Sequence, residues 1–376
     1  MLAQADTGSV EMEYRVAAEQ LQKHTDNFWL DGSKIGEHGL SRAWALLADW
    51  TVAYLNEHPD ATEKRLKSAA PNISGTALDA IRLAPRTFLV SAGIGSFGTV
   101  FIVDGSDGEH RLAWSIRSRA DRDAFPILSS WTAAAASTHC RISGEDDAGD
   151  CGTLTGQITR MPDDPGGHPR FYVNATYAQL AETTVGGQLS IWTWVGGTAH
   201  PLFVKRYIYN FEDERIRLDG DVMTVRTSDW YRSFFYCGTC IGRQMDWRLR
   251  IGSDKVEELG MAPVIPELDA VDELLYRAAR HRAMDDMASD QAQEAAATLM
   301  ADADRDPQDT DFISIGMVGG HAVSHRGQVS MVCLQTDGVA PMRFTMERRG
   351  GGFFITGMGT LPPNSDFDKA CPHDKP

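Results

Sequence analysis

The feature that most constrains the fold is a period of two in the hydrophobic pattern between about residues 86 and 260. In one clear stretch, apolar Met245, Trp247, Leu249 and Ile251 occupy every second position, with polar residues between them. Trp114 lies in a second alternating stretch, so Trp114 and Trp247 are both predicted to be buried. Successive side chains of a β-strand point to opposite faces of a sheet, so this pattern is typical of antiparallel strands with one buried and one wet face. The middle of the chain is therefore predicted to be a large antiparallel β core.

Glycine-containing turns divide the β region into hairpins. Three segments share the form of strand, turn and strand, at residues 101–116, 191–208 and 332–346. Their irregular spacing does not establish a repeat. The pattern leaves open a propeller-like fold with degenerate blades or two packed antiparallel sheets.

Helical periodicity marks the N-terminal region. Trp44 and Leu47 belong to an apolar face that recurs at helical spacing, and Pro59 is expected to end that helix. Asp60, followed three positions later by Glu63, resembles a capping box and predicts the start of a further short helix.

A second helical region is expected after the β core. Pro266 precedes acidic Glu267 in the first turn, and basic Arg277 lies near the expected end, as the helix dipole favours. The acidic stretch 284–311 predicts another, more exposed helix that ends in a solvated loop near Pro307.

The resulting fold class is α+β. We predict five consecutive parts: a helical N-terminal region (1–80), an antiparallel β core (81–265), a helical insertion (266–311), a C-terminal β-meander (312–362) and a tail (363–376).

Six cysteines include two short-range pairs. Cys140 and Cys151 bracket an acidic loop, and Cys237 and Cys240 are separated by only two residues. Such pairs predict two disulfides and hence an oxidising compartment. Residues 3–5, Ala-Gln-Ala, resemble the end of a secretory signal peptide, which agrees with a periplasmic or extracellular location.

Other interpretations of these cysteines are less favoured. The Cys237–Cys240 pair resembles the motif of a thiol-disulfide oxidoreductase, but the alternating segment 243–251 predicts a strand, which offers no helix N-terminus to lower a thiol pKa. No second pair completes a zinc site, and the acidic residues between Cys140 and Cys151 do not follow the calcium-loop spacing. Spacing alone does not assign Cys333 and Cys371.

The segment Gly93–Val100 matches the glycine-loop pattern of protein kinases. The following strand lacks the required lysine, and the catalytic and metal-binding motifs are missing downstream. A dinucleotide site would need a helix after the glycines, whereas residues 99–103 are β-branched or aromatic. We therefore predict a hairpin and no cofactor. The nearby acidic turn with Asp104, Asp107 and Glu109 is expected to be solvated.

Histidines and aromatic residues are further site candidates. His321 and His325 share one face of a predicted strand but lie about 13 Å apart, too far to bind one metal ion. Four aromatic residues on neighbouring strands are possible ligand-stacking groups if exposed, although burial in the core is favoured. They are Trp192, Trp194, Tyr207 and Tyr209.

The net charge and the lengths of the apolar runs limit the kinds of partner that the protein can have. A net charge of −16 disfavours nucleic acid as a partner, and no apolar run reaches the length of a membrane span. We expect an exported, non-catalytic protein that binds a partner protein or an envelope glycan, with no metal and no identified catalytic residue. The alternative is an exported enzyme, either a hydrolase with unrecognised carboxylates or an oxidoreductase using Cys237 and Cys240.

The first prediction is that Cys140–Cys151 and Cys237–Cys240 are disulfides in the exported protein. Peptide mapping under non-reducing conditions should recover both linked peptides. Free thiols at all four positions would contradict the pairing and the compartment inferred from it.

Overall fold

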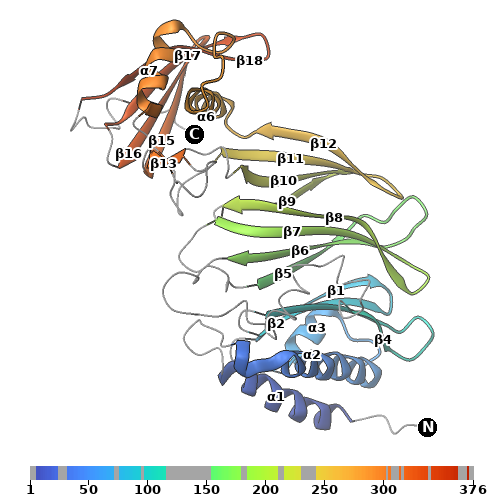
Figure 1. Cartoon of the computed structure of the whole chain (residues 1–376). Coiled ribbons are helices and arrows are strands. Elements are labelled where there is room, and N and C mark those ends of the chain that lie inside the picture. Colours follow the sequence, from blue (N-terminus) through green and yellow to red (C-terminus); the bar gives the residue numbers. More distant parts are fainter. Residues whose placement is uncertain are drawn as a thin grey trace. The chain divides into compact units, whose positions relative to one another are not determined.

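The structure is a computed structural model of residues 1–376 and shows an α+β chain dominated by antiparallel sheets (Figure 1). It describes residues 6–23, 32–71, 76–94, 97–115, 154–178, 184–210, 216–229, 243–301, 304–305, 313–314, 317–337, 340–362 and 371. The chain divides into two compact units. Unit 1 comprises Met1–Tyr207 and Ile251–Glu257, and unit 2 comprises Ile208–Arg250 and Glu258–Pro376.

In the described residues of the N-terminal region lie helices α1 (Thr7–Lys23), α2 (Gly32–Glu57) and α3 (Glu63–Ala69). As expected, α2 ends just before Pro59. The predicted capping box was wrong, because Thr62 and not Asp60 caps α3. The Thr62 hydroxyl accepts a hydrogen bond from the Arg65 backbone N–H at 3.2 Å. A hydroxyl immediately before the first helical residue satisfies a free N–H better than a carboxylate two residues farther away.

Four four-stranded sheets follow in the part of the chain that the structure describes, and in each the neighbouring strands are consecutive in sequence. Sheet A contains β1 (Thr76–Ala84), β2 (Thr87–Ile94), β3 (Phe97–Asp104) and β4 (Arg111–Ser115). Sheet B contains β5 (Leu154–Met161), β6 (Arg170–Ala178), β7 (Thr184–Val195) and β8 (Thr198–Asn210). Sheet C contains β9 (Ile216–Asp219), β10 (Val222–Asp229), β11 (Arg243–Ile251) and β12 (Val256–Pro263). Sheet D contains β15 (Met317–Arg326), β16 (Val329–Asp337), β17 (Met342–Arg349) and β18 (Gly352–Thr360), and β13 (Asp304–Arg305) pairs with β14 (Ile313–Ser314).

The three expected hairpins are confirmed as β3–β4, β7–β8 and β16–β17, each joining adjacent strands of one sheet. Meanders of four strands in sequence order are also the building plan of a propeller blade. Within unit 1, sheets A and B pack on each other, so the alternative of packed antiparallel sheets describes this unit.

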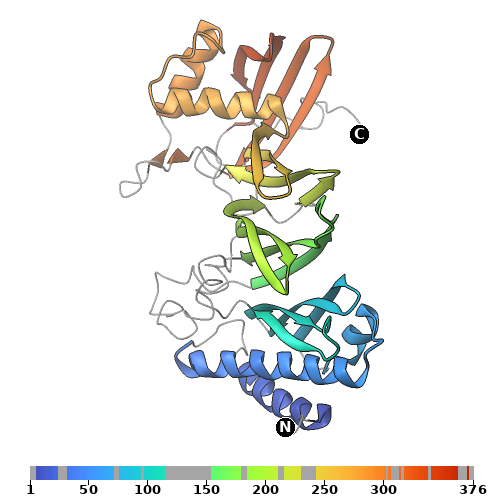
Figure 2. The same cartoon turned by 90° about the vertical axis from the view of Figure 1, so that its right-hand side faces the viewer.

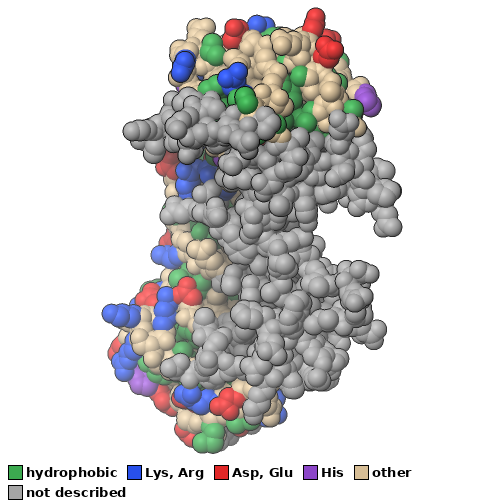
Figure 3. All heavy atoms as spheres, turned by 90° about the vertical axis from the view of Figure 1, so that its left-hand side faces the viewer, with side chains coloured by type: hydrophobic (Ala, Val, Ile, Leu, Met, Phe, Trp, Pro, Cys, Tyr) green, Lys and Arg blue, Asp and Glu red, His purple; other side chains and the backbone are tan. Residues whose placement is uncertain are grey.

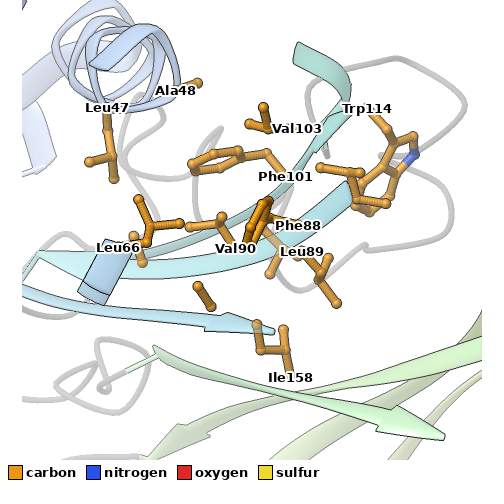
Figure 4. Close-up of a cluster of buried hydrophobic side chains, with 14 of the residues drawn as sticks. Leu47, Ala48, Leu66, Phe88, Leu89, Val90, Phe101, Val103, Trp114 and Ile158 are labelled. Atoms are coloured by element: carbon orange, nitrogen blue, oxygen red, sulfur yellow. The ribbon is translucent and has the colours of Figure 1, made fainter. Parts of the chain in front are cut away.

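Sheet A lies between the helices and sheet B. Figure 4 shows Phe101 and Val103 on the side of α2, while Ile158 of β5 lies on the opposite side. Leu89 and Ile102 are paired across β2 and β3 and are fully buried. Figure 2 shows α1 and α2 together along this end of unit 1. Both central strands are therefore buried on both faces, which explains their continuous apolar runs and departs from the expected single buried face.

In unit 2, helices α6 (Pro266–Ala279) and α7 (Asp290–Ala301) cover one face of sheet D. Helix α6 begins at the predicted proline, with Glu267 and Asp269 in its first turn. The segment before α7 also closes the edge of the sheet. Ser289 donates its backbone N–H to Ile355 at 2.9 Å, and Ile355 donates to Met287 at 2.8 Å.

A disulfide between Cys333 and Cys371 lies on the other face of sheet D. Both residues are buried, and they pack with Ala322 of β15 and with Leu361. The structure thus assigns the pair that sequence spacing left open. Among the helices in the described residues, none is both long and apolar enough to span a bilayer.

Trp114 and Trp247, predicted to be buried by their alternating strands, are 8% and 1% exposed. The ring centroids of Trp114 and Trp192 lie 5.2 Å apart. Replacing Trp114 with Ala should reduce the free energy of unfolding by about 3–5 kcal/mol, because a large buried ring leaves a cavity. Leu112→Ala, two residues away at an exposed position, is the control in denaturant unfolding. A loss below about 1 kcal/mol for Trp114→Ala would contradict its place in the core.

Removal of the Cys333–Cys371 disulfide should also destabilise the protein. The bond closes a loop with a sequence separation of 38. Restricting a loop of this length in the unfolded chain contributes about 4 kcal/mol in the chain-entropy model. The double variant Cys333→Ala, Cys371→Ala should lose stability of this order in urea. A free energy of unfolding within about 1 kcal/mol of the wild-type value would show that the bond contributes little to stability.

Candidate interaction surface

The four cysteines of the predicted pairs, Cys140, Cys151, Cys237 and Cys240, lie outside the described residues. Their pairing stays a prediction. The same holds for the acidic loop between Cys140 and Cys151.

Of the four aromatic candidates, the two tryptophans are buried in the core of unit 1. Trp192 is 1% exposed and Trp194 is 7% exposed. The Trp192 ring stacks on Phe171, with centroids 6.4 Å apart. Core packing therefore occupies both indoles, and neither offers an open face to a ligand. Tyr207 and Tyr209 belong to β8, but their side chains lie outside the described residues.

The glycine segment occurs in a hairpin, as predicted. Gly93 pairs with Gly98 and Ile94 with Phe97 across β2 and β3. The strand that follows the glycines leaves no place for the helix that a dinucleotide site needs.

In the turn after β3, Asp107 and Glu109 are exposed as expected, but Asp104 is buried and not solvated. Its carboxylate accepts hydrogen bonds from the Thr87 and Ser106 hydroxyls, each at 2.7 Å. Burial alone would raise the pKa of Asp104, but these hydrogen bonds outweigh it and hold the pKa below its ordinary value. The expectation for Asp104 failed because Thr87, whose hydroxyl donates to this carboxylate, is 17 residues away in sequence.

The same turn ends at His110, whose ring is also buried. The His110 backbone binds the Asn56 side chain of α2 in both directions, donating at 2.7 Å and accepting at 3.0 Å. Neither ring nitrogen has a hydrogen-bond partner among the described residues. Burial and the nearby Arg86 charge lower the pKa of His110, and Asp104 opposes them. We interpret this cluster as a structural link between α2 and sheet A.

On the helix-facing side of sheet D, His325 Nε2 lies 2.9 Å from Glu267 Oε1 in a hydrogen bond. His321 is on the same strand face, and burial lowers its pKa. The predicted separation of the two histidines is consistent with their place on β15. The described residues contain no group of three or more potential metal ligands.

The opposite face of sheet D is built by strand register. Arg326 pairs with Val329, Val329 with Glu347, and Glu347 with Phe354, which makes one row across all four strands. The adjacent row contains Met346 and Ile355, which pack under the helices. Because alternate residues point to opposite faces, the row from Arg326 to Phe354 points away from the helices.

The surface extends from this row in both directions along the strands. Arg349 lies two residues after Glu347, on the same face. In the other direction are Met331, which packs beside the disulfide, and Arg343, which pairs with Cys333. We call this set of seven residues the arginine face: Arg326, Val329, Met331, Arg343, Glu347, Arg349 and Phe354.

The arginine face combines apolar surface with positive charge. Val329 is 37% exposed. The Arg349 guanidinium lies 3.7 Å from the centroid of the Phe354 ring and also contacts Glu347 at 3.2 Å. In the space-filling view, the described surface around α6, α7 and sheet D presents apolar side chains beside charged ones (Figure 3).

Charges on the arginine face do not balance. Three arginines stand against one carboxylate, Glu347, and that carboxylate is shared with Arg349. Arg326 and Arg343 are exposed, and neither forms an ion pair within the part of the chain that the structure describes. Exposed arginine stacked on an aromatic ring is a frequent anchor at protein interfaces. Sequence reasoning missed this surface.

The sequence matches no known protein-family model, and no curated protein shows significant similarity to it. We therefore infer function from the chemistry of the surface.

The lowered pKa values of His110 and His321 predict a pH dependence of stability. A histidine whose folded pKa is lowered stays neutral in the fold, whereas the unfolded chain binds a proton below its ordinary pKa of 6.5. Stability should thus be full above this value and fall as the pH drops below it. His110→Phe should lose less stability than the wild type between about pH 7.5 and about pH 5.5 in urea unfolding. Equal losses in both proteins would exclude His110 as a contributor.

Proposed function

We propose that the chain is an exported, non-catalytic interaction protein that binds a partner protein through the arginine face of sheet D. The observation that carries the proposal is the surface formed by exposed Val329 and by Arg349 stacked on Phe354, on a sheet whose other face is closed by helices. Apolar surface kept open beside arginine and an aromatic ring is typical of protein interfaces.

A protein partner is favoured over a glycan by the state of the aromatic ring. Sugars bind to open aromatic faces, whereas one face of Phe354 is covered by the Arg349 guanidinium. The two tryptophans that would have suited a sugar are buried in unit 1. Export is supported by the Cys333–Cys371 disulfide, since such bonds persist in oxidising compartments.

Site-specific photocrosslinking in cells that export the protein tests the proposal. A photoreactive phenylalanine analogue at Val329 should give a discrete crosslinked product with another protein. Leu112, on sheet A of unit 1, is the matched control because its exposure of 39% is close to the 37% of Val329. The crosslinked protein, once purified, should bind the wild type in calorimetry and bind Val329→Asp more weakly. No product at Val329, or the same products at both positions, would contradict the proposed surface.

A further inference from the structure

Resting on the proposed function, we infer that the partner presents an extended acidic segment to the arginine face, with carboxylates near both ends of the segment. Such a segment fits the charges of the arginine face, their spacing along the strands and the charge of the whole chain.

Arg326 and Arg343 indicate the sign of the partner. Both are exposed, and neither forms an ion pair with another described residue, so a carboxylate of a partner can reach each guanidinium from solvent. Arginine presents a rigid fork of donors that binds a carboxylate through two hydrogen bonds. Arg349 is held in place by Phe354 and Glu347, which limits the entropy lost when it binds.

The spacing of the arginines fits an extended segment. Arg343 and Arg349 lie on the same face of β17, six residues apart, or about 20 Å along the strand. An extended partner chain rises by a similar distance per residue, so carboxylates about six residues apart reach both ends of the surface. Between them, an apolar residue of the partner can pack on Val329 and Met331. A short acidic turn would reach only one end.

The net charge of the whole chain favours binding of an acidic partner at the arginine face over binding elsewhere on the protein. With a net charge of −16, most of the protein repels an acidic partner. A local positive surface on such a protein directs the partner to one place during association, and this effect weakens as salt screens it. Binding should therefore depend on the arginines and on ionic strength.

Fluorescence anisotropy of the full-length protein with a synthetic peptide tests the inference. The probe is a labelled peptide of about eight residues with paired glutamates at both ends and valine and threonine between them, long enough to span the arginines. Its matched control has glutamine in place of every glutamate. We expect the acidic peptide to bind at least about tenfold more tightly than the control, and less tightly at about 200 mM than at about 20 mM salt.

Two double variants of the protein distinguish the effect of charge at the arginine face from the effect of the net charge of the chain. Arg326→Gln with Arg343→Gln should weaken binding of the acidic peptide by about tenfold. The control, Arg42→Gln with Arg111→Gln, removes the same charge from side chains that are 70% and 67% exposed in unit 1, and should change binding by less than about twofold. Equal binding of both peptides, or equal effects of the two double variants, would overturn the inference.

Two further results distinguish this inference from the function on which it rests. If Val329 still crosslinks a partner protein that binds the Arg326→Gln, Arg343→Gln variant at wild-type affinity, the interaction surface stands and the acidic segment is excluded. Sedimentation of the protein alone should show no self-association. A dimer abolished by Val329→Asp would assign the surface to a second copy of the chain and overturn the acidic partner.

Discussion

The structure depends on how each sheet covers its two faces. A sheet with two apolar faces is stable only when both are removed from water. In unit 1, sheet A meets this requirement with α2 on one face and sheet B on the other, through Phe101 on one side and Ile158 on the other. Burial on both faces permits the unbroken apolar runs of β2 and β3, and the polar turn at Asp104 and His110 joins these strands to the helix.

Sheet D buries its apolar residues in a different way, and the face that it leaves exposed is the surface to which we assign the proposed function. Helices α6 and α7 close one face, and the segment around Ser289 closes the edge of β18. On the other face, the Cys333–Cys371 disulfide packs with Ala322 and Leu361. The remaining surface combines exposed Val329 with arginines, so it tolerates water and still retains apolar area for a partner.

Much of the fold could be predicted from sequence because local chemistry determines it. Alternation placed Trp114 and Trp247 in the core, and Pro266 with its acidic first turn marked the start of α6. Features that depend on strand register could not be predicted. Asp104 finds Thr87 only once β2 and β3 pair, and the arginine face forms only once the registers of β15, β16 and β17 bring Arg326, Val329 and Glu347 into one row.

The Cys333–Cys371 bond also has a consequence for how the protein matures. Six cysteines allow fifteen complete pairings. Together with the two predicted pairs, this bond joins every cysteine to its neighbour in order of synthesis. A chain that emerges from a translocon N-terminus first would then acquire its native bonds if an oxidase linked each new thiol to the one before it. Such a protein would mature without a disulfide isomerase, because no bond made in order of emergence would have to be broken again.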